Sequence, residues 1–550
     1  MSAFLNTESN TKRHWFIDIV LLTLLIGSAF AFMLGSRPLN VPDEARYSEV
    51  AREMLVTHDF ITPRLNGIKY FEKPALFYWM QAASLKTFGL SEWACRLMDA
   101  LMALLGCLAT YFTARMLFDR KTGLFSAVIL SSSLLYFALA RVITLDMTVS
   151  IWLCLSLFSF ISGVYKSRSY FYLLYIFAAL AVLTKGLIGI IFPGSIIFLW
   201  ILLTWNWKVL KECYLLKGGI IFLLITLPWH ILVQIKNPEF FHFYFIDQQF
   251  NRYLTMEAHR YQPDWYYIPI VLLGLFPWTG FLYGTIKNIK WRDSKELFFV
   301  ISALFIFVFF SLSKSKLVPY VLPCMPFLAI LTGKYFATLN SRFQGIDGFV
   351  GFITASMISI AVVSALPFFL SPDITTNFRL AQNWSYILSA ILILNAVIVP
   401  WIYWKKGFLT AFIAQIICSV LFLFSLCATV PYIYMDSIKT MAIYLKSQFK
   451  PGDIIATYDY YYQDLPFYLE HTVTIVNWEG ELDFGHHYAH AQNLMIQAPA
   501  FWPLWQGTQT VYMMISKDLL QTVQKRFPQN HFYLKSESKN DVLVTNHEDK

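Results

Sequence analysis

Charged residues are scarce in this chain of 550 residues. Asp, Glu, Lys and Arg together make up 14% of it, whereas soluble domains contain about 25%. A soluble protein of this length could not cover its surface with so few charges. Apolar residues reach 57% and the mean hydropathy is +0.52. The composition therefore excludes a disordered chain and indicates a polytopic α-helical membrane protein.

Cysteines are few, and several common catalytic motifs are missing. The seven cysteines include no C-x-x-C pair, which excludes a disulfide scaffold and favours buried thiols. No Walker A sequence, no G-x-G-x-x-G after a strand and no G-x-S-x-G is present. These absences disfavour a nucleotide-driven pump and a soluble nucleotide-sugar enzyme. The net charge of +9 comes from short basic clusters between apolar runs, which is typical of membrane topology and argues against a nucleic-acid partner.

Thirteen apolar segments are long enough to span about 30 Å of hydrocarbon. They lie at about 15–34, 95–117, 123–140, 147–164, 170–184, 186–204, 218–235, 266–285, 297–313, 317–337, 349–370, 385–404 and 408–430. If the N-terminus is cytoplasmic, the inner short loops hold eighteen Lys and Arg and the outer short loops hold five. This bias predicts a cytoplasmic N-terminus and an outer C-terminus.

Three larger segments then lie on the outer side: loops 35–94 and 236–265, and the tail 431–550. Aromatic residues in the first loop predict interfacial helices there. The tail is predicted to be a soluble α/β domain that begins with an amphipathic helix near 436–449. Strand-like runs follow at 453–457, 472–476, 509–515 and 541–546. The chain thus divides into a membrane domain, 1–430, and the tail, 431–550.

Acidic residues occur at two places on the outer side. Asp43 and Glu44 follow Pro42 in the first loop, and Asp146 follows Arg141 at the start of the fourth span. An ionisable group at such a depth is expected to face a bundle interior or a water-filled cavity. Two converging carboxylates would suit a cation or a polarised hydroxyl. The alternative is that these residues only cap the helices that follow them.

Basic residues also gather on the outer side, against the positive-inside rule. They are Lys73, Lys185, Arg252, Arg260, Lys314 and Lys316. Their presence indicates an anionic partner such as a phosphate, although each alone could extend to lipid headgroups. An enzyme with its site outside has no nucleotide supply. A lipid-linked phosphate would provide a donor that is anionic, membrane-held and already activated.

The order and content of the motifs resemble a known family. The motifs are Pro42-Asp43-Glu44-Ala45-Arg46-Tyr47, Tyr70-Phe71-Glu72-Lys73-Pro74, Thr184-Lys185-Gly186, His259-Arg260 through Trp265-Tyr266-Tyr267, and Ser313-Lys314-Ser315-Lys316-Leu317 to Tyr320. Together with the span count and the outer tail, this set resembles the bacterial 4-amino-4-deoxy-L-arabinose lipid A transferases. These are lipid-phosphate-dependent glycosyltransferases of the GT-C fold. The resemblance runs from the first span to about residue 330.

The resemblance implies transfer of the aminosugar from undecaprenyl phosphate to a lipid A phosphate of lipopolysaccharide. The reaction would take place on the periplasmic side of the bacterial inner membrane and give resistance to cationic antimicrobial peptides. Asp43, Asp146 and Glu44 would serve the sugar and catalysis. The donor phosphate would be held by Lys73, Arg260, Tyr70, Tyr320 and Lys185.

A metal and the identity of the sugar are left open by the sequence. Glu72 and His259 are candidate ligands for a divalent metal such as zinc, and no cofactor is otherwise required. One departure weakens this prediction, because a His is expected after Asp247 and the chain has Gln248. The alternatives are a sister transferase with another polyprenyl-phosphate sugar or acceptor and a lipid or sugar transporter. A transporter would need charges near the membrane midplane, whereas here they gather at one interface.

Overall fold

A computed structural model describes residues 12–251, 261–339, 346–369, 371–433, 437–488 and 491–548. The chain forms two compact units. The first, called the helical unit, comprises Met1–Arg37, Arg96–Ile231 and Phe241–Tyr434. The second, called the mixed unit, comprises Pro38–Cys95, Leu232–Phe240 and Met435–Lys550. The first predicted outer loop therefore belongs with the tail, and the predicted boundary at residue 430 remains a prediction.

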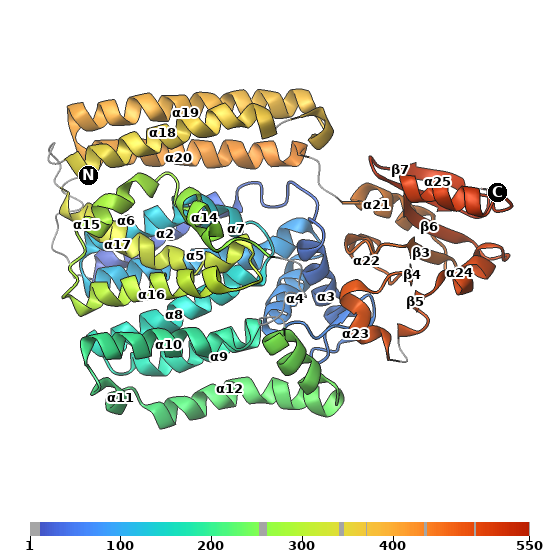
Figure 1. Cartoon of the computed structure of the whole chain (residues 1–550), viewed down its shortest axis with the longest axis horizontal. Coiled ribbons are helices and arrows are strands. Elements are labelled where there is room, and N and C mark those ends of the chain that lie inside the picture. The colour runs from blue at the N-terminus through green and yellow to red at the C-terminus, as the bar shows by residue number, and fades with distance from the viewer. Residues whose placement is uncertain are drawn as a thin grey trace. The chain divides into compact units, whose positions relative to one another are not determined.

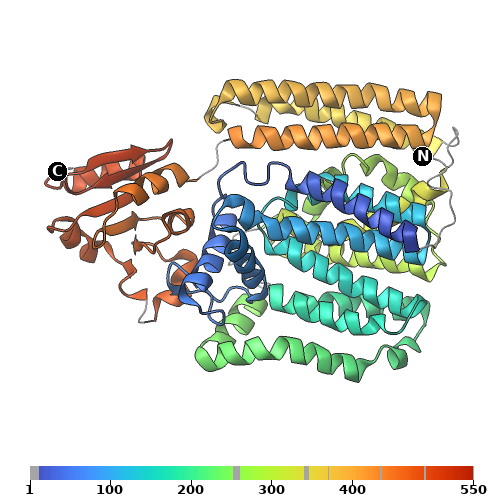
Figure 2. The same ribbon diagram turned by 180° about the vertical axis from the view of Figure 1, so that it is seen from behind.

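Eight helices among the described residues are long and apolar enough to cross a membrane. They are α2 (Lys12–Ala31), α5 (Glu92–Leu117), α8 (Leu145–Tyr165), α12 (Leu215–Lys236), α16 (Ser294–Leu312), α18 (Ile346–Phe369), α19 (Phe378–Lys406) and α20 (Phe408–Thr429). Helices α18, α19 and α20 lie side by side in Figures 1 and 2. The predicted polytopic helical membrane fold is confirmed.

Shorter helices occupy the other predicted spans. They are α6 (Arg120–Ser132), α7 (Leu134–Leu139), α9 (Tyr170–Lys185), α10 (Ile188–Thr204), α14 (Tyr267–Gly274), α15 (Leu282–Lys287) and α17 (Cys324–Thr338), with short turns at η3 (Thr279–Phe281) and η4 (Val318–Val321). Outside these spans or at their ends lie α11 (Val209–Glu212), the π-helix η1 (His242–Asn251) and short turns at η2 (Asp264–Tyr266), η5 (Pro372–Ile374) and η6 (Val430–Tyr432). The segment predicted as one span at 266–285 bends by 107°. Pro277 lies at this break, where its ring and missing N–H oppose a continuous helix. The total of thirteen spans remains a prediction.

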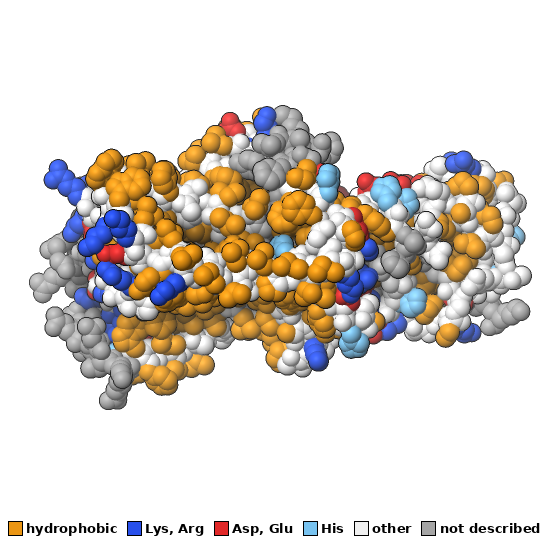
Figure 3. Space-filling model, turned by 90° about the horizontal axis from the view of Figure 1, so that it is seen from below, with side chains coloured by type: hydrophobic (Ala, Val, Ile, Leu, Met, Phe, Trp, Pro, Cys, Tyr) orange, Lys and Arg blue, Asp and Glu red, His pale blue; other side chains and the backbone are white. Residues whose placement is uncertain are grey.

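The surface of the helical unit matches a lipid environment. Large apolar side chains such as Leu24, Leu216 and Val397 are exposed, and Figure 3 shows apolar side chains along the length of the unit. Exposed apolar surface on this scale would aggregate in water. Together with the long apolar helices, it identifies the chain as a multi-span membrane protein.

A buried ion network joins three helices of this unit. Asp18 of α2 accepts hydrogen bonds from Tyr111 and Arg115 of α5, each at 2.6 Å. Arg120 of α6 donates to both oxygens of Asp18, at 2.6 and 2.8 Å. Asp18 is 1% exposed. One carboxylate is therefore shared by two buried guanidinium groups.

The tail of the mixed unit contains a six-stranded sheet in the order β5-β4-β3-β6-β8-β7. Its strands are β3 (Ile454–Tyr458), β4 (Thr474–Val476), β5 (Met495–Ile496), β6 (Val511–Ser516), β7 (Tyr533–Glu537) and β8 (Asp541–Thr545), and its helical segments are α21 (Lys439–Gln448), α22 (Asp464–Leu469), η7 (Gly480–Leu482), α23 (Asp483–His486), α24 (Ala498–Trp505) and α25 (Lys517–Arg526). Strands β5, β4, β3 and β6 are parallel to one another, and β8 is antiparallel to both of its neighbours, β6 and β7. The four predicted strands and the first helix are confirmed, whereas β5 and β7 were missed.

The first predicted outer loop folds onto this tail. It forms α3 (Asp43–Thr57), a hairpin of β1 (Arg64–Leu65) and β2 (Ile68–Lys69), and α4 (Leu76–Phe88). The hairpin turns at Asn66-Gly67, both with positive φ, which is the preferred pair for a two-residue turn. The buried Asn66 amide donates to the carbonyl of Val473 at 2.7 Å and accepts its N–H at 2.8 Å.

Helix α3 buries two carboxylates one turn apart. Arg52 donates twice to Glu49, at 2.6 and 2.7 Å. Glu53 accepts the N–H of Gly67 at 2.9 Å. Burial raises the pKa of Glu53 well above its ordinary value, and the neighbouring Glu49 raises it further.

The raised pKa of Glu53 makes the stability of the mixed unit depend on pH. Since the folded protein holds this proton more tightly than the unfolded chain, the stabilisation is complete below the unfolded pKa and is lost as pH rises through the folded one. We expect Glu53→Gln to become more stable than wild type as pH rises above 5, by at most about 1.4 kcal/mol per pH unit. Thermal unfolding in detergent between pH 5 and 8 measures this difference. Glu470→Gln, which changes an exposed glutamate, is the control. A stability difference between Glu53→Gln and wild type that stays constant with pH would refute the prediction.

Candidate active site

The first predicted catalytic carboxylate, Asp43, begins α3 and is paired with a buried arginine. Asp43 Oδ1 accepts a hydrogen bond from Arg46 Nη2, and Arg46 Nη1 donates to Glu481 Oε2. The side chains of Arg46 and Glu481 are 8% and 13% exposed, whereas that of Asp43 is 46% exposed. Asp43 is therefore the carboxylate of this chain of charges that is open to a ligand.

Glu44 lies beside Asp43 in the first turn of α3 but is buried. Its Oε2 accepts the N–H of Asn40 at 2.9 Å. Such a contact satisfies a backbone donor at the start of a helix and fixes the entry of the chain. It gives Glu44 a structural task, and its predicted part in catalysis remains untested.

Two buried phenols, Tyr70 and Tyr78, interact electrostatically with the Arg46 side chain. Tyr70 and Tyr78 are at most 2% exposed, and neither hydroxyl has a hydrogen-bond partner among the described residues. Burial raises the pKa of both phenols well above the ordinary value, and Arg46 lowers it by less. Both groups therefore remain protonated donors. An unpaired buried hydroxyl costs about 1–3 kcal/mol, which a ligand that accepts a hydrogen bond would recover.

Lys73 and Glu72 lie together just before α4. Lys73 Nζ donates to the carbonyl of Glu72 at 2.9 Å and is 3.9 Å from the Glu72 carboxylate. Each side chain is 14% exposed. The predicted phosphate-binding cation and the predicted metal-binding carboxylate are thus immediate neighbours.

Three predicted residues of the helical unit also come together. Lys185, at the end of α9, donates to Asp146 Oδ1 at 2.5 Å, and its ammonium lies 4.6 Å from the centre of the Tyr320 ring. Thr144, not Asp146, occupies the N-cap of α8. The alternative that Asp146 only caps this helix is therefore wrong, because its carboxylate is paired with Lys185.

Other predicted basic residues differ in their surroundings. Lys316 is 2% exposed and donates to the carbonyl of Gln262 at 2.8 Å, so it holds the backbone that enters α14. Lys314 is exposed. Arg252, His259 and Arg260 lie outside the described residues.

The two predicted metal ligands are Glu72 and His259. Glu72 offers a carboxylate, but its predicted companion His259 falls in the segment that the structure does not describe. Within the described ranges, Glu479, Asp483 and His486 place one ligand atom each within 4.8 Å of one another. The two acids are exposed, and such groups are common without a metal. The metal therefore remains a prediction.

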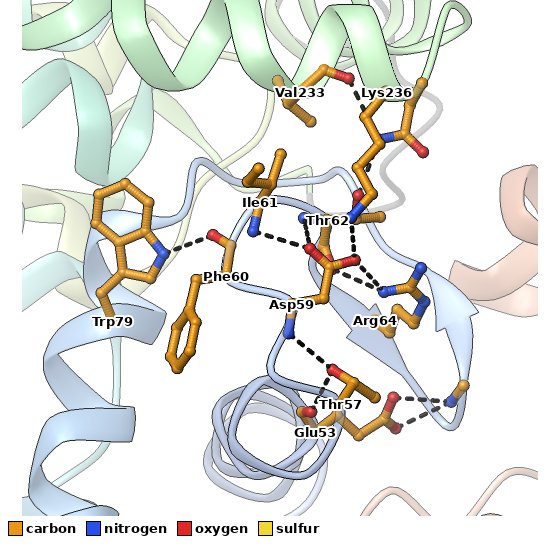
Figure 4. A network of polar contacts seen from close by, with 12 residues as sticks. Glu53, Thr57, Asp59, Phe60, Ile61, Thr62, Arg64, Trp79, Val233 and Lys236 are labelled. Carbon is orange, nitrogen blue, oxygen red and sulfur yellow. Dashed lines mark hydrogen bonds and ion pairs between the residues drawn. The ribbon is translucent and has the colours of Figure 1, made fainter.

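An aspartate that the sequence analysis missed connects two parts of the mixed unit. Asp59 Oδ2 accepts from Arg64 at 2.7 Å and from Lys236, at the end of α12, at 2.8 Å, as Figure 4 shows. Its Oδ1 accepts the N–H groups of Ile61 and Thr62. Burial alone would raise the pKa of Asp59, but these hydrogen bonds outweigh burial and lower it.

Asp59 lies in the wall of an open cavity of about 680 Å³, which Arg64 and Lys236 also line. The hydrogen bonds of Asp59 to backbone N–H groups two and three residues later form a common turn. Such a turn can be predicted from the local sequence. The pairing of Asp59 with Lys236 cannot, because the two residues are 177 positions apart.

Comparisons with known proteins identify the family of this chain. The model for Dolichyl-phosphate-mannose-protein mannosyltransferase matches residues 72–232, and that for the Aminoarabinose transferase C-terminal domain matches residues 441–546. An undecaprenyl phosphate-alpha-4-amino-4-deoxy-L-arabinose arabinosyl transferase 2 of Proteus mirabilis is 32% identical over 372 residues, which are 64% of this chain and 67% of the relative. The chain belongs to this arabinosyl transferase family.

A second relative and a solved structure extend the comparison. The arabinosyl transferase 1 of Proteus mirabilis is 32% identical over 338 residues, which are 60% of this chain and 61% of that relative. The crystal structure of ArnT from Cupriavidus metallidurans bound to undecaprenyl phosphate is 27% identical, with a TM-score of 0.86. It covers 98% of this chain and 99% of its own. The likeness to this ArnT structure, which has the GT-C fold, therefore covers nearly all of the chain and includes the tail.

Proposed function

We propose that this protein transfers 4-amino-4-deoxy-L-arabinose from undecaprenyl phosphate to a phosphate of lipid A. The observation that carries the proposal is the full-length likeness to an ArnT structure that holds undecaprenyl phosphate. The site would face the periplasm from the bacterial inner membrane, with the N-terminus in the cytoplasm. The modified lipid A would carry less negative charge and bind cationic antimicrobial peptides more weakly.

The acceptor requires no strong base. A phosphate monoester has a second pKa near 6 and is already largely ionised at neutral pH. Asp43 would then pair with the ammonium of the aminosugar and orient it, rather than remove a proton. Its exposed carboxylate, held from one side by Arg46, suits this task.

The donor phosphate would be held by cations and buried donors. Lys73, Arg260 and Lys185 would stabilise the charge on the departing phosphate, an electrostatic contribution that often dominates catalysis. The unpaired Tyr70 hydroxyl would donate to a phosphate oxygen, and Tyr320 lies beside Lys185. Because Lys185 already contacts Asp146, it would share its charge between that carboxylate and the phosphate.

A divalent metal, if Glu72 and His259 bind one, would supply further positive charge near the phosphates. In support of this, Glu72 contacts Lys73, the residue proposed to hold the donor phosphate. The roles proposed for Asp43, Lys73 and Tyr70 do not depend on the metal.

The test is mass spectrometry of lipid A from a host that makes lipid-linked aminoarabinose but lacks its own transferase. Expression of this protein is expected to add a pentosamine to lipid A. Addition of a hexose or another aminosugar would support a sister transferase instead. No covalent change, with the protein present in the membrane, would refute the proposal and favour a sister transferase that uses another donor.

A further inference from the structure

The carboxyl ends of β3 and β4 carry polar loops in the tail. In open α/β sheets this edge is the usual place for a ligand. Gln463 follows β3 and Glu481 follows β4, and both side chains are largely buried. Helix α3 lies against the neighbouring α22. The two loops therefore face a helix of the first predicted outer loop.

A continuous series of polar contacts runs from these loops to Asp43. Gln463 Nε2 donates to Glu481 Oε1 at 3.3 Å. Glu481 Oε2 accepts from one terminal nitrogen of Arg46, and the other terminal nitrogen donates to Asp43 Oδ1. A guanidinium is rigid and planar, so fixing one of its nitrogens fixes the direction of the other.

We propose that Glu481 is a positioning residue of the transferase, which holds Arg46 so that Arg46 fixes the Asp43 carboxylate where it meets the sugar. This inference rests on the proposed function, because it takes Asp43 as the group that orients the aminosugar. It gives the tail a part in the reaction that acts through Arg46.

The burial of the pair supports a geometric role over a general electrostatic one. Burial raises the pKa of Glu481, and Arg46 lowers it by less, so the contact with Arg46 offsets only part of the cost of burying this charge. An ion pair that served only to hold the tail against the first predicted outer loop could involve any residues of that loop. This one instead shares its arginine with the exposed carboxylate of the site.

The test compares Glu481→Gln and Glu481→Asp with the control Glu537→Gln, which removes an exposed carboxylate from β7. Initial rates of pentosamine addition to lipid A are measured in membranes with equal amounts of protein. A displacement of about 1 Å can lower a rate about 100-fold. We expect both Glu481 variants to lose about tenfold to 100-fold in rate, with the melting temperature of Glu481→Asp unchanged and the control within about twofold of wild type.

A second comparison separates positioning from simple destabilisation. In an Arg46→Lys background, where the rigid fork is gone, Glu481→Gln is expected to cause almost no further loss. If the rate losses of Arg46→Lys and Glu481→Gln multiply in the double variant, the inference is overturned while the proposed function stands. A Glu481→Asp variant as active as wild type would have the same meaning. A wild-type protein that adds nothing to lipid A would overturn the proposed function and this inference with it.

Discussion

Replacement of Asp43 by Asn is expected to lower the rate of sugar transfer at least about 100-fold. Asparagine keeps the size and the hydrogen-bond acceptor for Arg46 but removes the negative charge that would pair with the aminosugar. The side chain is 46% exposed, so the fold does not depend on it. Arg46 also retains Glu481 as its second partner, and for this reason the guanidinium does not become a buried unpaired charge.

The measurement is the initial rate of pentosamine addition to lipid A, with the amount of protein in the membrane determined in parallel. Asp518→Asn is the matched control, since Asp518 is an exposed aspartate at the start of α25. The control is expected to keep its activity. Near-normal transfer by Asp43→Asn would remove Asp43 from the mechanism.

Replacement of Asp18 by Asn is expected to destabilise the protein by about 3–5 kcal/mol. Asp18 is the carboxylate that Arg115 and Arg120 share, and all three side chains are at most 8% exposed. Two guanidinium groups would be left in the interior opposite a neutral amide. The loss of one partner of a buried ion network costs far more than the loss of a surface pair, because the remaining charge cannot return to water.

Asp347 provides the comparison for Asp18. Asp347 pairs with Lys287 at 2.9 Å in the same unit, but the lysine is 57% exposed. Such pairs contribute about 0–1 kcal/mol, so Asp347→Asn is expected to change the melting temperature in detergent very little. Equal decreases for the two variants would show that burial of the Asp18 network does not matter.

Local patterns in the sequence predicted most of the secondary structure. Long apolar runs give helices because every backbone polar group in lipid must be satisfied within the helix, and α2, α8 and α20 follow them closely. The strands β3, β4, β6 and β8 were found from runs of β-branched and apolar residues. Strands β5 and β7 were missed because β5 has only two residues and β7 alternates weakly with charged Lys535 and Glu537.

The candidate site was predicted residue by residue, but its pairings were not. The motifs identified Asp146, Lys185 and Tyr320, yet their mutual contact is set by where α8 and α9 pack. Glu481 was missed entirely, since an isolated glutamate in a polar loop looks like a solvated charge. Its partner Arg46 is 435 residues away, and no local periodicity encodes such a contact.

The reciprocal bonds between Asn66 and Val473 impose an order on biosynthesis. The two residues are 407 positions apart, so at about 5–20 residues per second the hairpin emerges about 20–80 s before its partner strand. During that interval the acidic and basic side chains of α3 have no tail to bury them. The nascent chain therefore presents an incomplete surface to chaperones and proteases, and ribosomal stalling late in the gene would leave a membrane-inserted protein in which α3 has no tail to pack against.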